Sequence, residues 1–180
     1  MMSTAGERQC VVVMGVSGVG KTAVARRVAE RLDLPWIDAD DLHPPGNVAK
    51  MARGTPLDDA DRQPWLEAVG AWLREHSGAG SGGVVACLAL TRNYRDVLRR
   101  SAIGVVFVHL TAEPVVIAHR IAQRTGHFMP ASLLKSQLAL LEPLGPDEMG
   151  ARVDAGRDLA EVVDAAVRLL RGVGRGEWDS

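Results

Sequence analysis

The segment GVSGVGKT, residues 15–22, has the Gly-x-x-x-x-Gly-Lys-Thr spacing of a phosphate-binding P-loop. Its glycines allow the backbone to curl, so that successive N–H groups and the positive end of a following helix face one anion. The ammonium of Lys21 then reaches the outer phosphates, and the hydroxyl of Thr22 supplies a ligand for Mg²⁺. A glycine-rich turn without a ligand is the alternative. We assign nucleotide binding to the whole loop, which consists of Gly15, Val16, Ser17, Gly18, Val19, Gly20, Lys21 and Thr22.

Three carboxylates follow an apolar run in WIDADD, residues 36–41. In an extended strand Asp38 and Asp40 share one face, at the C-terminal edge of a sheet where α/β proteins bind ligands. A carboxylate there can orient a substrate hydroxyl, accept its proton and help to hold Mg²⁺ through water, as phosphoryl transfer to an alcohol requires. We predict that Asp40 is catalytic and contacts the substrate. The sequence leaves open whether Asp38 or Asp40 is the base or the metal residue, and whether Asp38, Asp40 and Asp41 are solvated or capping residues.

Two pairs of arginines have the spacing of one helical turn. Arg95 and Arg99 follow the third apolar run, where such a pair can clamp a carboxylate or a transferring phosphoryl group. Arg120 and Arg124 lead into TGHFMP, a segment that glycine and proline mark as a hinge. We predict that residues 120–148 include a mobile lid, which excludes water and brings Arg120 and Arg124 to the transition state as catalytic residues. Exposed helix faces are the alternative for both pairs.

Short apolar runs alternate with longer amphipathic segments, which is the pattern of βα units that form a parallel sheet in an α/β fold. Strands are predicted at residues 9–14, 35–39, 82–90, 104–110 and 151–155, and helices at residues 21–32, 59–76, 113–124 and 158–170. The 180 residues suffice for a single domain. Residues 41–81 are too many for a plain connection, and we predict that this insert binds the substrate.

Charge and cysteine content narrow the classes of partner. The chain has 21 basic and 22 acidic residues, a net charge of −1 and no basic tail, so we expect neither nucleic acid nor a membrane as partner. Cys10 and Cys87 lie in apolar runs, and the N-terminus lacks an apolar signal core, which favours the cytoplasm. An Asn/Thr-Lys-x-Asp segment that reads guanine is missing, so a GTP switch is disfavoured.

Three further segments follow the P-loop in order: DADDLHPPGNVAKMARGTPLDDADRQPWL at residues 38–66, YRDVLR at residues 94–99 and RTGHFMPASLLKSQLALLE at residues 124–142. Together with the P-loop they resemble the gluconokinase family, and the longest segment is the most specific. The resemblance implies a nucleoside-monophosphate-kinase-like, three-layer P-loop fold with a five-stranded parallel sheet and a mobile lid. It further implies a homodimeric phosphotransferase that uses ATP and Mg²⁺ to phosphorylate the 6-hydroxyl of D-gluconate, giving 6-phosphogluconate.

A sugar acid as acceptor makes further polar residues candidate ligands. His43 and Lys50 flank a turn rich in glycine and proline, where their donors can meet the carboxylate and hydroxyls of such a substrate. Helix-cap or surface roles are the alternative for His43 and Lys50. We predict that both contact the substrate, together with Arg95, Arg99 and, from the lid, His127. For His127 a structural role within the lid is the alternative.

The segment CLALTRNYRD, residues 87–96, departs from the family pattern, in which Cys-Ser-Ala-Leu-Lys-Lys or -Arg is usual. Leu88 replaces a hydroxyl and Thr91 replaces a lysine, which favours another small polyhydroxy acid as the alternative acceptor. Arg92 is a candidate to restore the lost charge. A nucleotide-binding module without catalysis is a further alternative, against which the intact P-loop and Asp40 argue.

Overall fold

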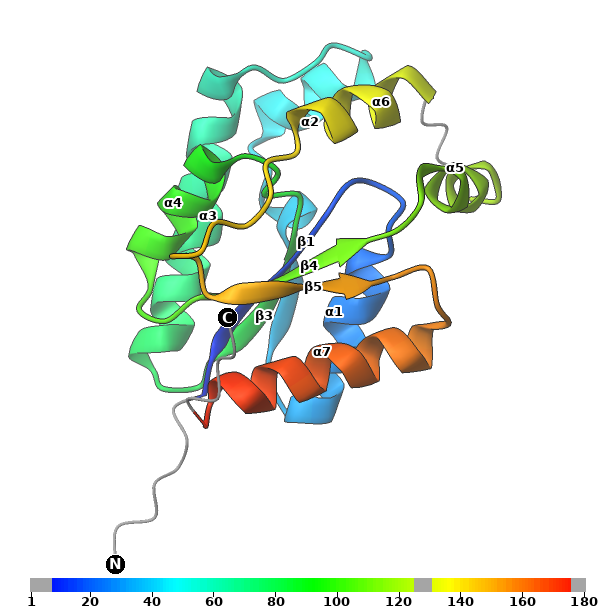
Figure 1. Ribbon diagram of the computed structural model, residues 1–180. Helices are drawn as coiled ribbons and strands as arrows, with labels where there is room; N and C mark the ends of the chain where they lie inside the picture. The colour runs from blue at the N-terminus through cyan, green and yellow to red at the C-terminus, as the bar shows by residue number, and fades with distance from the viewer. Residues whose placement is uncertain (1–7, 125–130, 176–180) are drawn as a thin grey trace, which may run out of the picture.

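The computed structural model describes residues 8–124 and 131–175, in which a parallel β-sheet lies between two layers of helices (Figure 1). The strands are β1 (Cys10–Met14), β2 (Trp36–Asp38), β3 (Gly83–Cys87), β4 (Val106–Thr111) and β5 (Gly150–Asp154). Their order in the sheet is β2-β3-β1-β4-β5, and every pairing is parallel. The predicted α/β fold with a five-stranded parallel sheet is confirmed.

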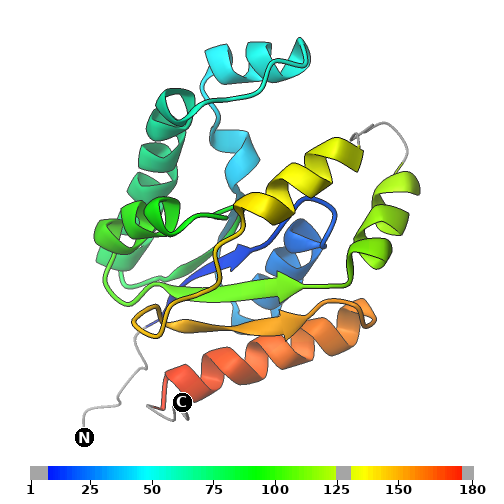
Figure 2. The same ribbon diagram turned by 45° about the horizontal axis from the view of Figure 1, so that its top comes forward.

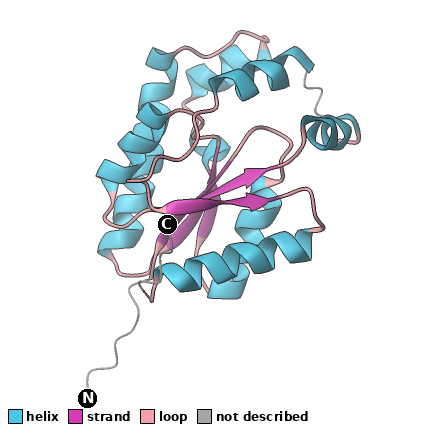
Figure 3. Ribbon diagram, viewed as in Figure 1, coloured by secondary structure: helices cyan, strands magenta, loops and turns pink. Residues whose placement is uncertain are grey.

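Helices connect the strands and cover both faces of the sheet (Figure 3). They are α1 (Lys21–Leu32), α2 (Pro45–Ala52), α3 (Asp59–Gly78), α4 (Arg92–Ser101), α5 (Pro114–Ala122), α6 (Ala131–Leu140) and α7 (Leu159–Val173), with a 3-10 helix η1 (Ala39–Leu42) after β2. The helices predicted from apolar spacing correspond to α1, α3, α5 and α7. The sequence interpretation gave no bounds for α2, α4 and α6. Of these, α2 and α6 lie in the two segments assigned to the substrate and the lid.

The central strand β1 builds two cores from one apolar run, because alternate side chains point to opposite faces of a sheet. Val11 and Val13 belong to the core that α1 and α7 cover. Val12 and Met14 belong to the core that α3 and α4 cover. Every residue of β1 is 2% exposed or less. This is why the strand is apolar throughout instead of alternating.

The loops that follow the strands meet at the C-terminal edge of the sheet. Figure 2 shows α6 beside the loop that follows β1, although the two segments are far apart in the chain. The fold therefore gathers the P-loop, η1, the start of α4 and α6 at one edge.

None of the described helices combines the length and the apolar character that a membrane crossing requires.

Candidate active site

The loop between β1 and α1 has a backbone conformation that glycine adopts far more readily than other residues. Gly15, Gly18 and Gly20 have φ angles of +149°, +84° and +105°. A Cβ atom on Gly15 would lie 2.7 Å from the carbonyl oxygen of Leu110 on β4. A Cβ atom on Gly18 would lie 2.5 Å from a side-chain carbon of Ile121 on α5. Close packing against β4 and α5 therefore requires glycine at residues 15 and 18, whereas at Gly20 the positive φ angle alone favours it.

The start of α1 is suited to bind an anion. The helix begins after Gly20, and no side chain caps its first amides, which leaves them to a ligand. The ammonium of Lys21 donates one hydrogen bond to the carbonyl oxygen of Val16 at 3.0 Å. Burial lowers the pKa of Lys21 to about 8, while the carboxylate of Asp40 opposes this shift and the guanidinium of Arg124 adds to it. Helix terminus and ammonium thus supply the positive potential that phosphates need.

Asp38 and Asp40 do not share one face of a strand, and that prediction is wrong. β2 ends at Asp38, whose side chain caps η1 by accepting a hydrogen bond from the backbone N–H of Asp40 at 3.0 Å. The other carboxylate oxygen of Asp38 accepts a hydrogen bond from the Thr22 hydroxyl at 2.6 Å. Asp38 therefore joins the P-loop to the end of β2 and leaves the carboxylate of Asp40 as a separate group.

The surroundings of Asp40 raise the pKa of its carboxyl above the ordinary value. The protein around the group reduces the hydration of its charged form, although the side chain is 84% exposed, and the charge of Asp38 adds to the shift. The positive charge of Lys21 opposes it. A carboxylate with a raised pKa is a stronger proton acceptor, so Asp40 has the environment of a general base.

His43 lies beside Asp40, with 3.9 Å between its Nε2 and a carboxylate oxygen of that residue. Its ring stacks on Trp65, with centroids 4.5 Å apart and an angle of 11° between the planes. The indole N–H of Trp65 donates to the carbonyl oxygen of Ala39 at 2.7 Å, which fixes η1 against α3. Burial lowers the pKa of His43, so the imidazole is neutral at neutral pH and can donate or accept a hydrogen bond next to Asp40.

Lys50, in contrast, is engaged within the protein. Its ammonium donates to both carboxylate oxygens of Asp61 at 2.8 and 2.9 Å. Asn47 adds a hydrogen bond to the carbonyl oxygen of Asp61 at 2.8 Å. These bonds hold α2 against the start of α3. The geometry therefore gives Lys50 a positioning role and does not support the predicted substrate contact.

The prediction that Arg95 contacts the substrate is wrong, because its side chain is fully buried. Nε and Nη2 donate to the carboxylate of Glu148 at 2.7 and 3.1 Å. The guanidinium also donates to the carbonyl oxygens of Ala89, Leu90 and Pro143 at 3.1 to 3.2 Å. Since a guanidinium has five N–H donors, these contacts use its whole capacity. Arg95 fastens the segment before β5 to α4.

Arg99 and Arg92 pair with acidic residues in the same region. Arg99 donates to Asp96 at 3.0 Å and to the carbonyl oxygen of Asp147 at 2.9 Å. It lines a hollow with Gly104, just before β4, at the opposite edge of the sheet from the P-loop. The prediction of a substrate contact for Arg99 is therefore wrong. Arg92 donates to the Asp147 carboxylate at 2.8 Å, which accounts for its charge within the protein, and its predicted role toward an acceptor stays a prediction.

The two unusual residues after β3 have local roles. Thr91 is the N-cap of α4, and its hydroxyl oxygen accepts a hydrogen bond from the backbone N–H of Tyr94 at 3.3 Å. Leu88 is half-buried and packs against both cores. Helix capping and core packing thus account for a hydroxyl at one position and an apolar side chain at the other.

Arg62 and Tyr94 were not assigned to the site from the sequence, yet they lie on its acceptor side. Nη1 of Arg62 donates to the Tyr94 hydroxyl oxygen at 2.8 Å, and that hydroxyl donates to Asp59 at 2.7 Å. The charge of Arg62 contributes to the lowered pKa of His43. In the sequence Arg62 stands at the start of a predicted helix, and nothing in its neighbourhood connects it to Tyr94.

Arg120 and Arg124 both lie near the P-loop. Nη1 of Arg120 donates to the carbonyl oxygen of Val19 at 3.2 Å, and the charge of Arg124 acts on Lys21. The structure brings both arginines to the nucleotide side of the site, and their catalytic role stays a prediction. His127 lies outside the described residues. The end of the predicted lid, residues 143–148, is held against α4 by Arg95.

α6 also reaches the P-loop, through a contact that the sequence interpretation missed. The side chain of Gln137 hydrogen-bonds to both the backbone and the hydroxyl of Ser17. The two residues are 120 positions apart, and no local signal indicates such a contact.

Comparisons with known proteins agree with this geometry. Residues 10–144 match a family model described as an AAA domain. The chain is 49% identical over 158 residues to a gluconokinase of Gluconobacter oxydans, an alignment that covers 88% of this chain and 89% of the relative. A crystal structure of a gluconokinase from Sinorhizobium meliloti has a TM-score of 0.86 at 44% identity and covers 94% of this chain and 95% of that one. Shikimate kinase from Aquifex aeolicus, with a TM-score of 0.59 at 14% identity and coverage of 93% and 99%, shares the fold.

Proposed function

The chain belongs to the gluconokinase family, and on this premise we propose that it uses ATP to phosphorylate D-gluconate at the 6-hydroxyl, giving 6-phosphogluconate. The observation that carries the proposal is the junction between the P-loop and η1. The Thr22 hydroxyl on Asp38, at 2.6 Å, sets the phosphate-binding loop beside the segment that carries Asp40. A phosphate donor and a hydroxyl acceptor are thereby brought to the same edge of the sheet.

Each residue of the site has its own role in an in-line phosphoryl transfer. The amides of the P-loop and the ammonium of Lys21 hold the phosphates. The 6-hydroxyl oxygen of gluconate attacks the γ-phosphorus as Asp40 accepts the hydroxyl proton, and the bond from that phosphorus to the bridging oxygen breaks to release ADP. Arg120 and Arg124 stabilise the charge that develops on the transferring phosphoryl group.

Thr22 and Asp38 are the residues suited to hold Mg²⁺. A hydroxyl oxygen and a carboxylate oxygen 2.6 Å apart, next to Lys21, form a pair of hard ligands of the type that this ion prefers. When bound, Mg²⁺ neutralises charge on the phosphate oxygens of ATP. Because Asp38 serves this pair, Asp40 is left to act as the base.

The acceptor side consists of neutral and cationic donors near Asp40. His43 offers a neutral imidazole held by Trp65, and Arg62 offers a guanidinium with one donor on Tyr94. A gluconate carboxylate and its hydroxyls require donors of both kinds. These residues come from the insert at residues 41–81 and from α4, which supports the assignment of that insert to the substrate.

The test is a coupled ADP-release assay that contains the purified protein, Mg²⁺ and ATP. The acceptors compared are D-gluconate, other aldonic acids, polyols and shikimate. Stimulation by gluconate, with 6-phosphogluconate identified as the product, is expected. Stimulation by another polyhydroxy acid in place of gluconate would contradict the acceptor. ATP binding without transfer to any acceptor would contradict catalysis itself.

A homodimeric, cytoplasmic enzyme completes the proposal. The resemblance to gluconokinases favours the dimer, and the use of ATP together with the two free cysteines, Cys10 and Cys87, favours the cytoplasm. Sedimentation of the purified chain tests the dimer.

Within residues 120–148, a lid that closes over ATP belongs to the same proposal, with its C-terminal end fixed by Arg95 and Glu148.

A further inference from the structure

α6 is attached to the P-loop by a reciprocal pair of hydrogen bonds. The backbone N–H of Ser17 donates to Oε1 of Gln137 at 2.8 Å, and Nε2 of Gln137 donates to Oγ of Ser17 at 3.0 Å. The orientation of the amide is determined by the pair, because a backbone N–H can only donate and must face the oxygen. Gln137 is 9% exposed, so neither bond is easily replaced by water.

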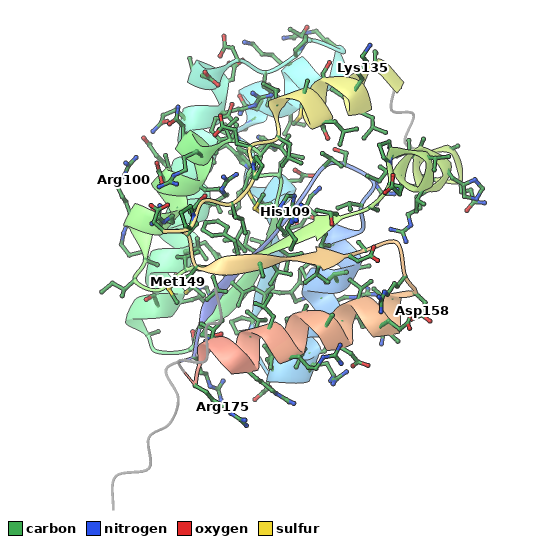
Figure 4. All side chains as sticks on the ribbon, in the orientation of Figure 1. Arg100, His109, Lys135, Met149, Asp158 and Arg175 are labelled. Carbon is green, nitrogen blue, oxygen red and sulfur yellow. The ribbon has the colours of Figure 1, made fainter. Side chains whose placement is uncertain are left out.

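The attachment is specific to one face of α6. Leu134, one turn earlier, is 7% exposed and packs in the same core as Val16 and Val19 of the P-loop. Among the described side chains of α6, Leu134 and Gln137 are the buried ones. Lys135, by contrast, lies on the outer surface of the molecule (Figure 4). The buried Leu134, with the half-buried Leu138 packed against the same core, and the polar side chain of Gln137 therefore join this helix to the loop.

The hydrogen bond to Gln137 separates one backbone amide of the P-loop from those that remain for a ligand. The N–H of Ser17 is held by Gln137, and that of Val19 is directed to the carbonyl oxygen of Val16 at 3.3 Å. The amides of Gly18 and Gly20 find no hydrogen-bond partner within the part of the chain that the structure describes. With the first turn of α1, they are the donors left for phosphate oxygens.

We propose that Gln137 is a positioning residue for ATP, which fixes the first turn of the P-loop through Ser17 so that the later amides face the phosphates. The residue acts through Ser17 and not by touching the reacting atoms. The inference deepens the proposed function, on which its kinetic readout rests, whereas its binding readout does not depend on the acceptor.

The test compares Gln137→Met with the wild-type chain. Methionine keeps the length and volume of the side chain and removes both hydrogen bonds. We expect the dissociation constant for ATP, measured by calorimetry without gluconate, and the KM for ATP to rise about tenfold, because the first turn of the P-loop is no longer held in place. The KM for gluconate should stay close to wild type, whereas the melting temperature should fall by a few degrees, because the buried N–H of Ser17 loses its acceptor. Ser136→Ala, an exposed position on the same helix whose hydroxyl donates to the carbonyl oxygen of Ser132, is the matched control.

A double-variant cycle establishes that the effect passes through Ser17. Ser17→Ala removes the hydroxyl that Gln137 contacts, and the combined variant should bind ATP no more weakly than Gln137→Met alone, because the two residues form one contact. Additive losses would overturn the inference. So would a Gln137→Met chain that melts earlier but binds ATP normally. If that variant does not fold, Gln137→Leu takes its place, since it also removes the acceptor of the Ser17 N–H, and unchanged ATP affinity there contradicts the inference. A wild-type chain that binds ATP but does not phosphorylate gluconate contradicts only the proposed function.

Discussion

At the scale of single residues, Asp38 and Asp40 have different partners, and that difference supports the different roles that we propose for them. Asp38 is bound by the Thr22 hydroxyl and by the N–H of Asp40. The carboxylate of Asp40 is exposed and has a raised pKa, first because the surrounding protein limits its hydration. A base must be open to its substrate, whereas a residue that supports a metal site must be held. The environment therefore separates two residues that the sequence presents as equivalent.

Asp40→Asn should lower kcat by about a hundredfold to ten thousandfold, the usual range for loss of a general base. The amide keeps the shape of the side chain but cannot accept the hydroxyl proton. The dissociation constant for ATP should stay near the wild-type value, because the P-loop is untouched. Asp41→Asn, an exposed neighbour in the same 3-10 helix, is the control. An Asp40→Asn enzyme with wild-type kcat would remove Asp40 from the mechanism.

The lowered pKa of Lys21 predicts a loss of activity at alkaline pH. With a pKa of about 8, the ammonium is charged below that value and becomes neutral as the pH rises through it. We expect kcat/KM for ATP to be level up to about pH 7 and to fall towards tenfold per pH unit above pH 8, because kcat/KM reports the free enzyme. For kcat the fall should begin at higher pH, since bound phosphates favour the charged form. A level kcat/KM profile up to pH 10 would contradict the assignment.

At the scale of elements, the arginines of α4 have structural roles along the length of the helix. Arg92 and Arg99 contact Asp147, and Arg95 contacts Glu148. These contacts tie the segment before β5 to α4. The arginines of α4 thus meet acidic groups of the protein itself. Beside the P-loop, positive charge comes from Lys21 and from Arg120 on α5, and their catalytic role stays a prediction.

Breaking the Arg95–Glu148 pair should destabilise the protein without changing its chemistry. Arg95→Ala leaves the buried carboxylate of Glu148 without its counter-charge, which typically costs about 3 to 5 kcal/mol. The midpoint of urea unfolding should fall accordingly, and the KM for gluconate of the folded enzyme should not change. Arg100→Ala, an exposed neighbour on the same helix, should leave the midpoint near wild type. A raised KM for gluconate at unchanged stability would restore Arg95 as a substrate ligand.

At the scale of the whole molecule, a buried histidine links stability to pH. His109 on β4 lies in the interior (Figure 4), is 2% exposed, and neither ring nitrogen has a hydrogen-bond partner among the residues described. Burial, with added repulsion from Arg95 and Arg152, lowers the pKa of His109 to about 4. The folded protein therefore keeps this imidazole neutral where the unfolded chain binds a proton.

The sign of the effect is a loss of stability as the pH falls. Below pH 6.5, the ordinary histidine value, the unfolded state gains a proton that the folded state takes up only near pH 4. Between pH 7 and pH 5 this difference costs about 2 kcal/mol of unfolding free energy. His109→Leu should reduce the loss of stability over that range by about the same amount, measured by urea unfolding at both pH values. His119→Gln, an exposed histidine, is the control, and equal pH dependence in the two variants would contradict the account.

The sequence by itself determined the features that depend on neighbouring residues. The P-loop could be recognised because its glycines and Lys21 must follow one another at fixed spacing, and the βα alternation could be recognised because burial imposes a local period on apolar residues. Asp40 could be named as a candidate base because it lies near the C-terminal end of an apolar run, where α/β proteins bind ligands, and that role stays a prediction. The segment at residues 38–66 was the most specific part of the resemblance to the gluconokinase family.

Only the tertiary structure decided which of two equally spaced arginine pairs lies beside the P-loop. Arg95 and Arg99 have the same helical spacing as Arg120 and Arg124, but spacing defines a face of a helix and not what that face meets. The order β2-β3-β1-β4-β5 sets α4 against the segment before β5 and brings α5 and α6 to the P-loop. The contact of Gln137 with Ser17 has the same origin, because residues 120 positions apart meet only when the layers of the fold are assembled.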